Sequence, residues 1–117
     1  MKRIVGIVFA IVIAFGISGC SENKKWYEHA TLHKSTIKVW KKATQEDKLA
    51  TSADWILTAS PRISNEIKNS GNIDNLKPYA NELVECINKS IDGVDTIDDQ
   101  QTTQSAITCM TLMGWLK

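Results

Sequence analysis

Apolar residues near the start of the chain form one continuous run, unlike those that follow. The run extends from Ile4 to Ile17 without a charge, and Lys2 and Arg3 precede it. A basic start followed by a short apolar run is typical of a secretory signal peptide. As a helix, the run would span about 21 Å, less than the roughly 30 Å hydrocarbon core of a membrane. The sequence therefore predicts a removed export signal at residues 1–19.

After the signal, apolar side chains recur every three or four residues, and no stretch shows the alternation of a strand. This spacing predicts a first helix over residues 28–43 and a second over residues 45–59. Thr44 is the expected N-cap of the second helix, with Asp47 reaching back to complete a capping box. A single long helix with a bend near Thr44 is the alternative.

Serine, proline and glycine mark the limits of a third helix. Ser60 before Pro61 favours a helix start, because the N–H that proline lacks would have no intrahelical partner in the first turn. Gly71 can adopt the left-handed conformation that often ends a helix. The sequence therefore predicts a short helix from Pro61 to Asn69.

Two more helices are predicted in the C-terminal third of the chain. The clearest apolar stripe extends from Leu76 to Ile91 and stops at a turn signal, Asp92-Gly93. An acidic connection then leads to a last helix from Gln100 to Leu116. The residues expected on one face of this last helix are Thr103, Ala106, Ile107, Met110 and Met113.

Cys86 and Cys109 lie in these two C-terminal helices. An even pair of cysteines in an exported chain favours a disulfide. Consecutive helices with a short connection prefer an antiparallel hairpin. Pairing of the two cysteines would place the turn of this hairpin near Ile97 or Asp98, inside the predicted connection. A disulfide is therefore expected, with free buried thiols as the alternative.

These patterns together predict an all-α fold, a small bundle of four to five short helices whose C-terminal helical hairpin is braced by a disulfide. The length after the signal suits one small domain. The expected organisation is a signal peptide at residues 1–19, a tether at residues 20–27 and a helical domain at residues 28–117.

The apolar run ends in Ile17-Ser18-Gly19-Cys20. These four residues resemble the lipobox of bacterial lipoproteins, and the resemblance covers the first 20 residues of the chain. It implies that a diacylglyceryl group is attached to the Cys20 sulfur and that the chain is cut before Cys20. Two or three acyl chains on one residue hold a protein stably, whereas one chain binds only marginally. An ordinary signal peptide or an uncleaved anchor is the alternative.

Ser21 follows the lipidated cysteine. By resemblance to Gram-negative lipoproteins, an aspartate there favours inner-membrane retention and a serine does not. The expected location is therefore the outer membrane, with the domain anchored by lipid and facing the periplasm. A Gram-positive host would place the same protein on the outer face of its only membrane.

Charge is unevenly distributed along the mature chain. Residues 20–69 contain nine Lys/Arg and six Asp/Glu, whereas residues 70–117 contain three and seven. A basic half could face anionic lipid, or the two halves could attract each other or simply be solvated. The near-neutral total and the export signal argue against a nucleic-acid partner.

Candidate catalytic and metal-binding residues are few. His29 and His33 would share a helix face, but a zinc site needs at least a third protein ligand. The sequence contains no nucleophile elbow, no phosphate-binding glycine loop and no C-x-x-C motif. We therefore expect no enzyme activity, no cofactor and no metal.

Four tryptophans in so short a chain suggest a binding surface, because tryptophan is enriched in interface hot spots. Trp40 is expected in the core, and Trp26, Trp55 and Trp115 are the candidate partner-binding residues. Trp26 lies close to the anchor, so its ring could instead rest at the lipid headgroups or begin the core.

The sequence thus favours a membrane-anchored lipoprotein that acts as a small protein-binding module, of the envelope-complex, immunity or exclusion type. A stress role is the alternative, because Ile91 to Asp95, ahead of a helix with a cysteine, resemble a segment of the HdeA-type acid chaperones. Those proteins are small, helical and periplasmic with one disulfide, but the first cysteine does not match and they are not lipidated. A small envelope enzyme is the remaining class.

Overall fold

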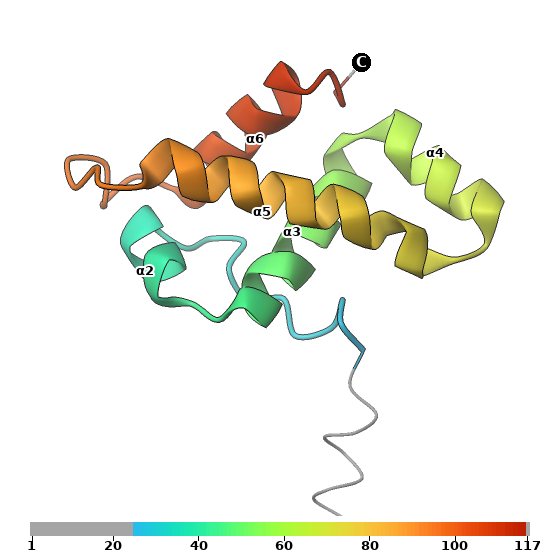
Figure 1. The fold of residues 1–117 in the computed structure, drawn as a ribbon, viewed down its shortest axis with the longest axis horizontal. Helices are drawn as coiled ribbons and strands as arrows, with labels where there is room; N and C mark the ends of the chain where they lie inside the picture. Colours follow the sequence, from blue (N-terminus) through green and yellow to red (C-terminus); the bar gives the residue numbers. More distant parts are fainter. Residues whose placement is uncertain (1–24, 117) are drawn as a thin grey trace, which may run out of the picture.

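Two fifteen-residue helices, α3 (Gln45–Ala59) and α5 (Lys77–Ile91), cross at the centre of the computed structural model, which describes residues 25–116 (Figure 1). Three shorter helices pack around them: α2 (Ile37–Lys42), α4 (Pro61–Ser70) and α6 (Thr102–Leu112). The described residues contain no strand, only an isolated antiparallel bridge between Thr36 and Gln101. The all-α prediction is therefore confirmed.

The first helix is much shorter than predicted. α2 spans Ile37–Lys42, and the Thr36 side chain caps it by accepting a hydrogen bond from the Val39 N–H. The expected helix over residues 28–36 is wrong, because backbone groups there bond to distant residues instead. The Thr31 N–H donates to Asp47 and the Leu32 N–H donates to Thr51, at 2.8 and 3.2 Å.

The start of α3 agrees with the sequence in one respect and differs in another. The Thr44 hydroxyl accepts a hydrogen bond from the Asp47 N–H at 3.1 Å, as expected of an N-cap. Ala43 and Thr44 are both extended, so α2 and α3 are separate helices. The Asp47 carboxylate does not complete a capping box, because it binds Thr31 instead.

Local signals set the limits of α4, which spans Pro61–Ser70. The Ser60 hydroxyl accepts from the Ile63 N–H and donates to the Trp115 carbonyl at 2.6 Å, so this cap also fixes the C-terminal segment. Gly71 ends the helix with a φ of 67°, in the left-handed region. A short 3₁₀ helix, η1 (Ile73–Leu76), then leads into α5.

The last helix, α6, spans Thr102–Leu112 and is shorter at both ends than the predicted Gln100–Leu116. Its start is delayed because the backbone around Gln101 pairs with residues ahead of α2. Its end is set by Gly114, whose φ is 74° and whose N–H bonds to the Thr111 carbonyl. The Trp115 N–H reaches the Met110 carbonyl, which completes a Schellman motif.

The predicted disulfide joins Cys86 of α5 to Cys109 of α6, with the two Cα atoms 6.0 Å apart. α6 returns along α5 after the connection at residues 92–101 (Figure 1). The C-terminal hairpin and its covalent brace are therefore both confirmed.

Trp40 attaches α2 to the two central helices. Its side chain is fully buried, as the sequence predicts, and its indole Nε1 donates to Asn88 Oδ1 of α5 at 2.9 Å. The Trp40 ring also stacks on Trp55 of α3, with ring centroids 5.8 Å apart. One residue of a six-residue helix thus contacts both long helices.

The basic and acidic halves of the chain meet at Lys41. Its ammonium lies 2.8 Å from Asp98 and 3.7 Å from Asp95, in the connection before α6. The hydrogen bond to Asp98 raises the pKa of Lys41, against a smaller opposing effect of burial. The attraction between the two halves is therefore realised at this residue, whereas Lys34, Lys38 and Lys42 remain exposed.

Tyr79 of α5 links α4 to the C-terminal segment. Its hydroxyl donates to the Glu66 carboxylate at 2.8 and 3.0 Å, and its ring meets the Trp115 ring edge-on at 5.5 Å. The Glu66 hydrogen bond raises the pKa of Tyr79, and burial and the Glu66 charge act in the same direction.

Loss of the disulfide should lower the free energy of unfolding by roughly 3 kcal/mol, because the bond closes a loop of about 24 residues in the unfolded chain. The test is urea unfolding of the oxidised protein beside a variant with Cys86→Ser and Cys109→Ser. Reduced wild-type protein should match the double variant. Unfolding of the oxidised wild type and of the double variant at the same urea concentration would contradict this prediction.

Tyr79 should ionise above its ordinary pKa of 10.0. Because the raised value belongs to the folded state, its stabilising effect is present below pH 10 and disappears as the pH rises through the folded pKa. A Tyr27→Phe variant leaves Tyr79 as the one tyrosine, so near-ultraviolet absorbance can follow its phenolate. Adding Glu66→Gln to this variant should lower the pKa of Tyr79 towards 10.0. A pKa of Tyr79 that rises instead would rule out the Glu66 hydrogen bond as the cause.

Candidate functional site

The predicted anchor, Cys20, and the sorting residue, Ser21, lie outside the described residues, as does the whole signal peptide. The described chain begins at Lys25, five residues after Cys20. Among residues 25–116, no helix is both long and apolar enough to cross a membrane.

Two of the three candidate partner-binding tryptophans belong to the core. Trp55 is 9% exposed and Trp115 is 5% exposed, so neither ring offers a surface for docking. Trp55 is covered by Trp40, and Trp115 by Tyr79 and the α4 cap. The residue type alone predicted an interface, whereas the tertiary packing uses these rings to fix short helices.

Trp26 is half-buried and packs against the core. Its indole Nε1 donates to Asp74 Oδ1 at 2.9 Å, and the Lys77 ammonium lies 5.8 Å from its ring centre. Trp26, which lies within the predicted tether at residues 20–27, therefore contacts the helical domain. Trp26 begins the core, as one of the two interpretations of this residue expected.

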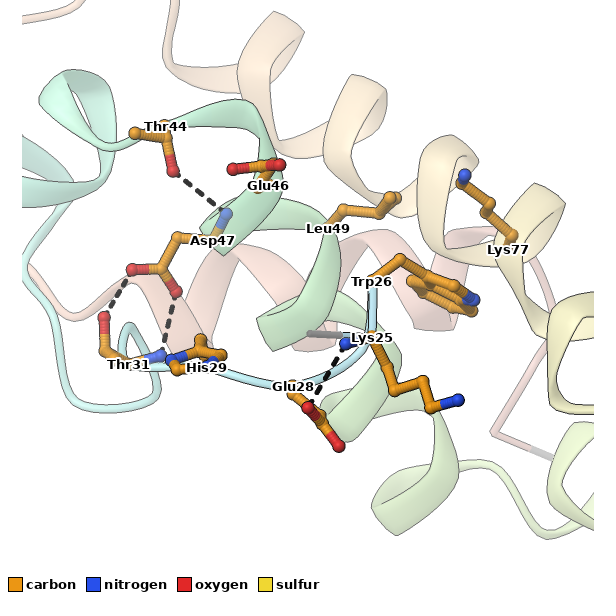
Figure 2. Close-up of a pocket in the computed structure, with 10 residues that line it drawn as sticks. All are labelled: Lys25, Trp26, Glu28, His29, Thr31, Thr44, Glu46, Asp47, Leu49 and Lys77. Carbon is orange, nitrogen blue, oxygen red and sulfur yellow. Dashed lines mark hydrogen bonds between the residues drawn. The ribbon is translucent and has the colours of Figure 1, made fainter. Parts of the chain in front are cut away.

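A hollow of about 480 Å³ lies between the start of the described chain and the beginning of α3 (Figure 2). Trp26 and Leu49 give it an apolar side, and Lys25 and Lys77 place two ammonium groups on its border. Its other lining residues are Glu28, His29, Thr31, Thr44, Glu46 and Asp47. Sequence spacing could not reveal the hollow, because its residues come from three separate segments.

The two histidines do not share a helix face, because no helix forms around them. His29 has a φ of 65°, in the left-handed region, and is exposed. His33 Nε2 lies 2.9 Å from Asp54 Oδ2 of α3. No group of three His, Cys, Asp or Glu side chains within residues 25–116 is arranged to hold a metal ion.

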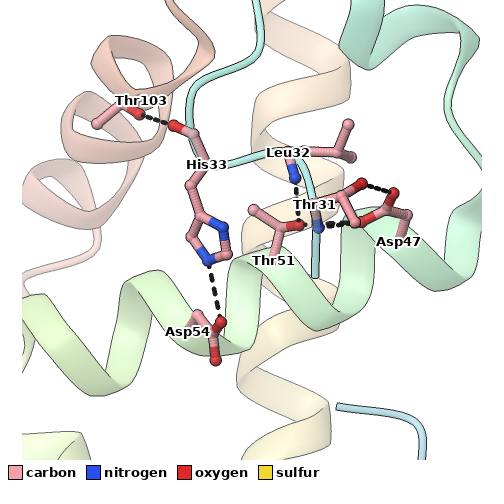
Figure 3. A network of polar contacts seen from close by, with 7 residues as sticks. All are labelled: Thr31, Leu32, His33, Asp47, Thr51, Asp54 and Thr103. Carbon is pink, nitrogen blue, oxygen red and sulfur yellow. Dashed lines mark hydrogen bonds and ion pairs between the residues drawn. The ribbon is translucent and has the colours of Figure 1, made fainter. Parts of the chain in front are cut away.

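Residues 25–34 form a non-helical segment, here called the strap, which lies across α3 (Figure 3). Asp47 accepts hydrogen bonds from both the backbone N–H and the hydroxyl of Thr31. The buried Thr51 hydroxyl accepts from the Leu32 N–H and donates to Asp47 at 3.2 Å. These contacts join the strap to α3 through a connected polar network.

Further contacts fix the two ends of the strap. His33 pairs with Asp54 through its ring, while its carbonyl accepts a hydrogen bond from the Thr103 hydroxyl of α6 at 2.8 Å. At the other end, Trp26 bonds to Asp74 of η1. Each such hydrogen bond contributes only about 0.5–1.5 kcal/mol, or somewhat more where a charge takes part. The strap is thus seated by many weak contacts.

Within residues 25–116, two of the three exposed large hydrophobic side chains lie on the outer face of α6, and the third is Val39 of α2. Leu112 is 78% exposed and Ile107 is 47% exposed, although the sequence grouped Ile107 with Ala106 and Met110 on one face. That prediction is wrong, because Ala106, Cys109 and Met110 occupy the buried side. The other exposed residues of this face are Gln104, Thr108 and Thr111. No charged residue occurs from Gln100 to Leu116.

Two shallow hollows lie beside the disulfide, and the first of them borders this face. One of about 240 Å³ is lined by Leu112, Thr108 and Cys86, among others. Another of about 500 Å³ is lined by Cys86 and Met113 together with Glu82 and Glu85. Cys86 of the disulfide lines both hollows.

Comparison of the chain with protein-family models, with curated proteins and with solved structures gave no match. The resemblances of Ile17 to Cys20 to a lipobox and of Ile91 to Asp95 to the acid chaperones therefore stay predictions from the sequence.

Proposed function

We propose that this chain is a lipid-anchored protein of the bacterial envelope, held in the outer membrane through Cys20 and facing the periplasm, whose helical domain binds a protein partner. The observation that carries the binding role is the exposed, charge-free outer face of α6. The lipobox-like end of the apolar run supports the anchor.

The disulfide supports export to an oxidising compartment. Such bonds persist in the periplasm and on cell surfaces, and they are rare where thiols are kept reduced. The Cys86–Cys109 bond is formed within the domain, which leaves Cys20 free to carry lipid. In this proposal Cys86 and Cys109 brace the domain, and Cys20 attaches it to the membrane.

The composition of the α6 face supports a protein as its partner. Interface cores are depleted of charge, whereas ordinary surfaces of soluble domains are rich in it. Leu112 and Ile107 provide apolar contact area, and the threonine and glutamine side chains around them can exchange hydrogen bonds. An eleven-residue helix presents a ridge of about 16 Å.

The short tether limits where the partner can lie. Lys25, where the described domain begins, is five positions after Cys20, so it lies within about 17 Å of the anchor. The partner is therefore a component of the same membrane or a molecule arriving close to it. A subunit of an envelope complex fits this geometry, and so does an incoming protein that the domain would block.

Site-specific crosslinking in intact cells tests the binding role. A photoreactive residue in place of Leu112 or Ile107 should yield the same crosslinked species, whereas one in place of Asn65, exposed on α4, should not. Thr108→Asp should abolish the crosslink from position 112, because it places a charge in the middle of the face.

The matched control is Asn65→Asp, which adds the same charge to α4 and should leave the crosslink unchanged. Equal products from positions 65 and 112, or a product that survives Thr108→Asp, would contradict the assignment of the surface. No product from any of the three positions would contradict the binding role itself.

A further inference from the structure

We propose that the strap is the releasable part of the tether. It detaches from α3 as a unit while the helices stay folded, and its release lengthens the reach of the domain from the membrane. This inference rests on the lipid anchor of the proposed function.

The first support is the scarcity of burial in the strap. Among residues 25–34 only Leu32 is buried, at 4% exposed, and four others are half-buried, namely Trp26, Tyr27, Ala30 and His33. The contacts of Trp26 with Asp74 and of Thr31 with Asp47 lie at exposed positions. Segments with little burial and solvent-accessible hydrogen bonds open locally at the smallest free-energy cost.

The second support is the contrast between the strap and its base. Directly after the strap, the Ser35 carbonyl accepts from the Thr102 N–H at 3.0 Å, and the two hydroxyls lie 3.1 Å apart. Thr102 is fully buried, and the Thr36–Gln101 bridge follows. Detachment of the strap would therefore stop at Ser35 and leave α2 and α6 in place.

The third support is the backbone of the strap itself. His29 adopts a φ of 65°, which is unfavourable for a residue with a Cβ atom. His29 follows a turn in which the Glu28 N–H donates to the Lys25 carbonyl, and Trp26 and Thr31 are bonded on either side of it. Detachment lets His29 relax to an ordinary conformation.

Release changes the reach of the domain about threefold. While the strap is bound, Lys25 is five positions after Cys20, and this stretch spans at most about 17 Å. With the strap free, Ser35 is fifteen positions after Cys20, and this stretch spans at most about 50 Å. The anchored domain could thus contact partners at two different distances from the membrane.

Hydrogen exchange of the full mature chain tests the opening. Peptides covering the strap should exchange faster than peptides covering α5. Asp47→Asn with Asp54→Asn should accelerate exchange in the strap at least tenfold and leave α5 unchanged. The control pair, Asp92→Asn with Asp99→Asn, removes the same charge from exposed positions away from the strap and should change neither.

Equal exchange rates in the strap and in α5 would overturn the inference, because the strap would then open only with the whole fold. So would equal acceleration of both segments by the Asp47 and Asp54 changes. Exchange does not require the lipid, so a chain found without lipid would contradict the proposed function and still report on the strap.

The reach is measured on supported bilayers of phosphatidylcholine and phosphatidylglycerol that carry the lipidated chain. Neutron reflectometry should place the protein layer farther from the bilayer for the Asp47 and Asp54 double variant than for wild type or the control pair. An unchanged distance with accelerated exchange would overturn the role of the strap in reach.

Discussion

The packing of α3 against α5 is the contact on which the other elements depend. Ile56 of α3 and Leu83 and Ile87 of α5 are fully buried, and each such side chain contributes about 1.5–3 kcal/mol by leaving water. α2 joins this pair through Trp40, which touches both helices. The remaining elements pack on the outside of the α3–α5 pair.

The attachments to that central pair differ greatly in strength. α6 is joined to α5 by the Cys86–Cys109 bond, and its charge-free outer face is thereby held on a fixed support. The strap is joined to α3 mainly by hydrogen bonds, which range from the exposed Thr31–Asp47 contact to the buried Leu32–Thr51 contact. Under the proposed function, this difference gives a rigid surface for the partner and a looser connection to the anchor, because local opening begins where burial is least.

Local signals made part of this fold predictable. The limits of α3 and α4 follow from Thr44, Ser60 and Pro61, whose capping and backbone preferences act within one turn. Residues 28–34 of the strap were predicted as helix, because their apolar spacing is helical and the residue that binds the Thr31 amide, Asp47, lies sixteen positions away in the sequence. A long-range hydrogen bond of this kind has no local pattern. For the same reason, residue type could not show that Trp55 is buried.

The intact mass of the protein extracted from membranes tests the central claim, a disulfide-braced domain held by lipid on Cys20, most directly. The predicted mass is that of residues 20–117 with a diacylglyceryl group, with or without a further amide-linked acyl chain, and it should increase by two hydrogen atoms on reduction. A mass without lipid, a chain that still carries residues 1–19, or a mass unchanged by reduction would contradict the claim.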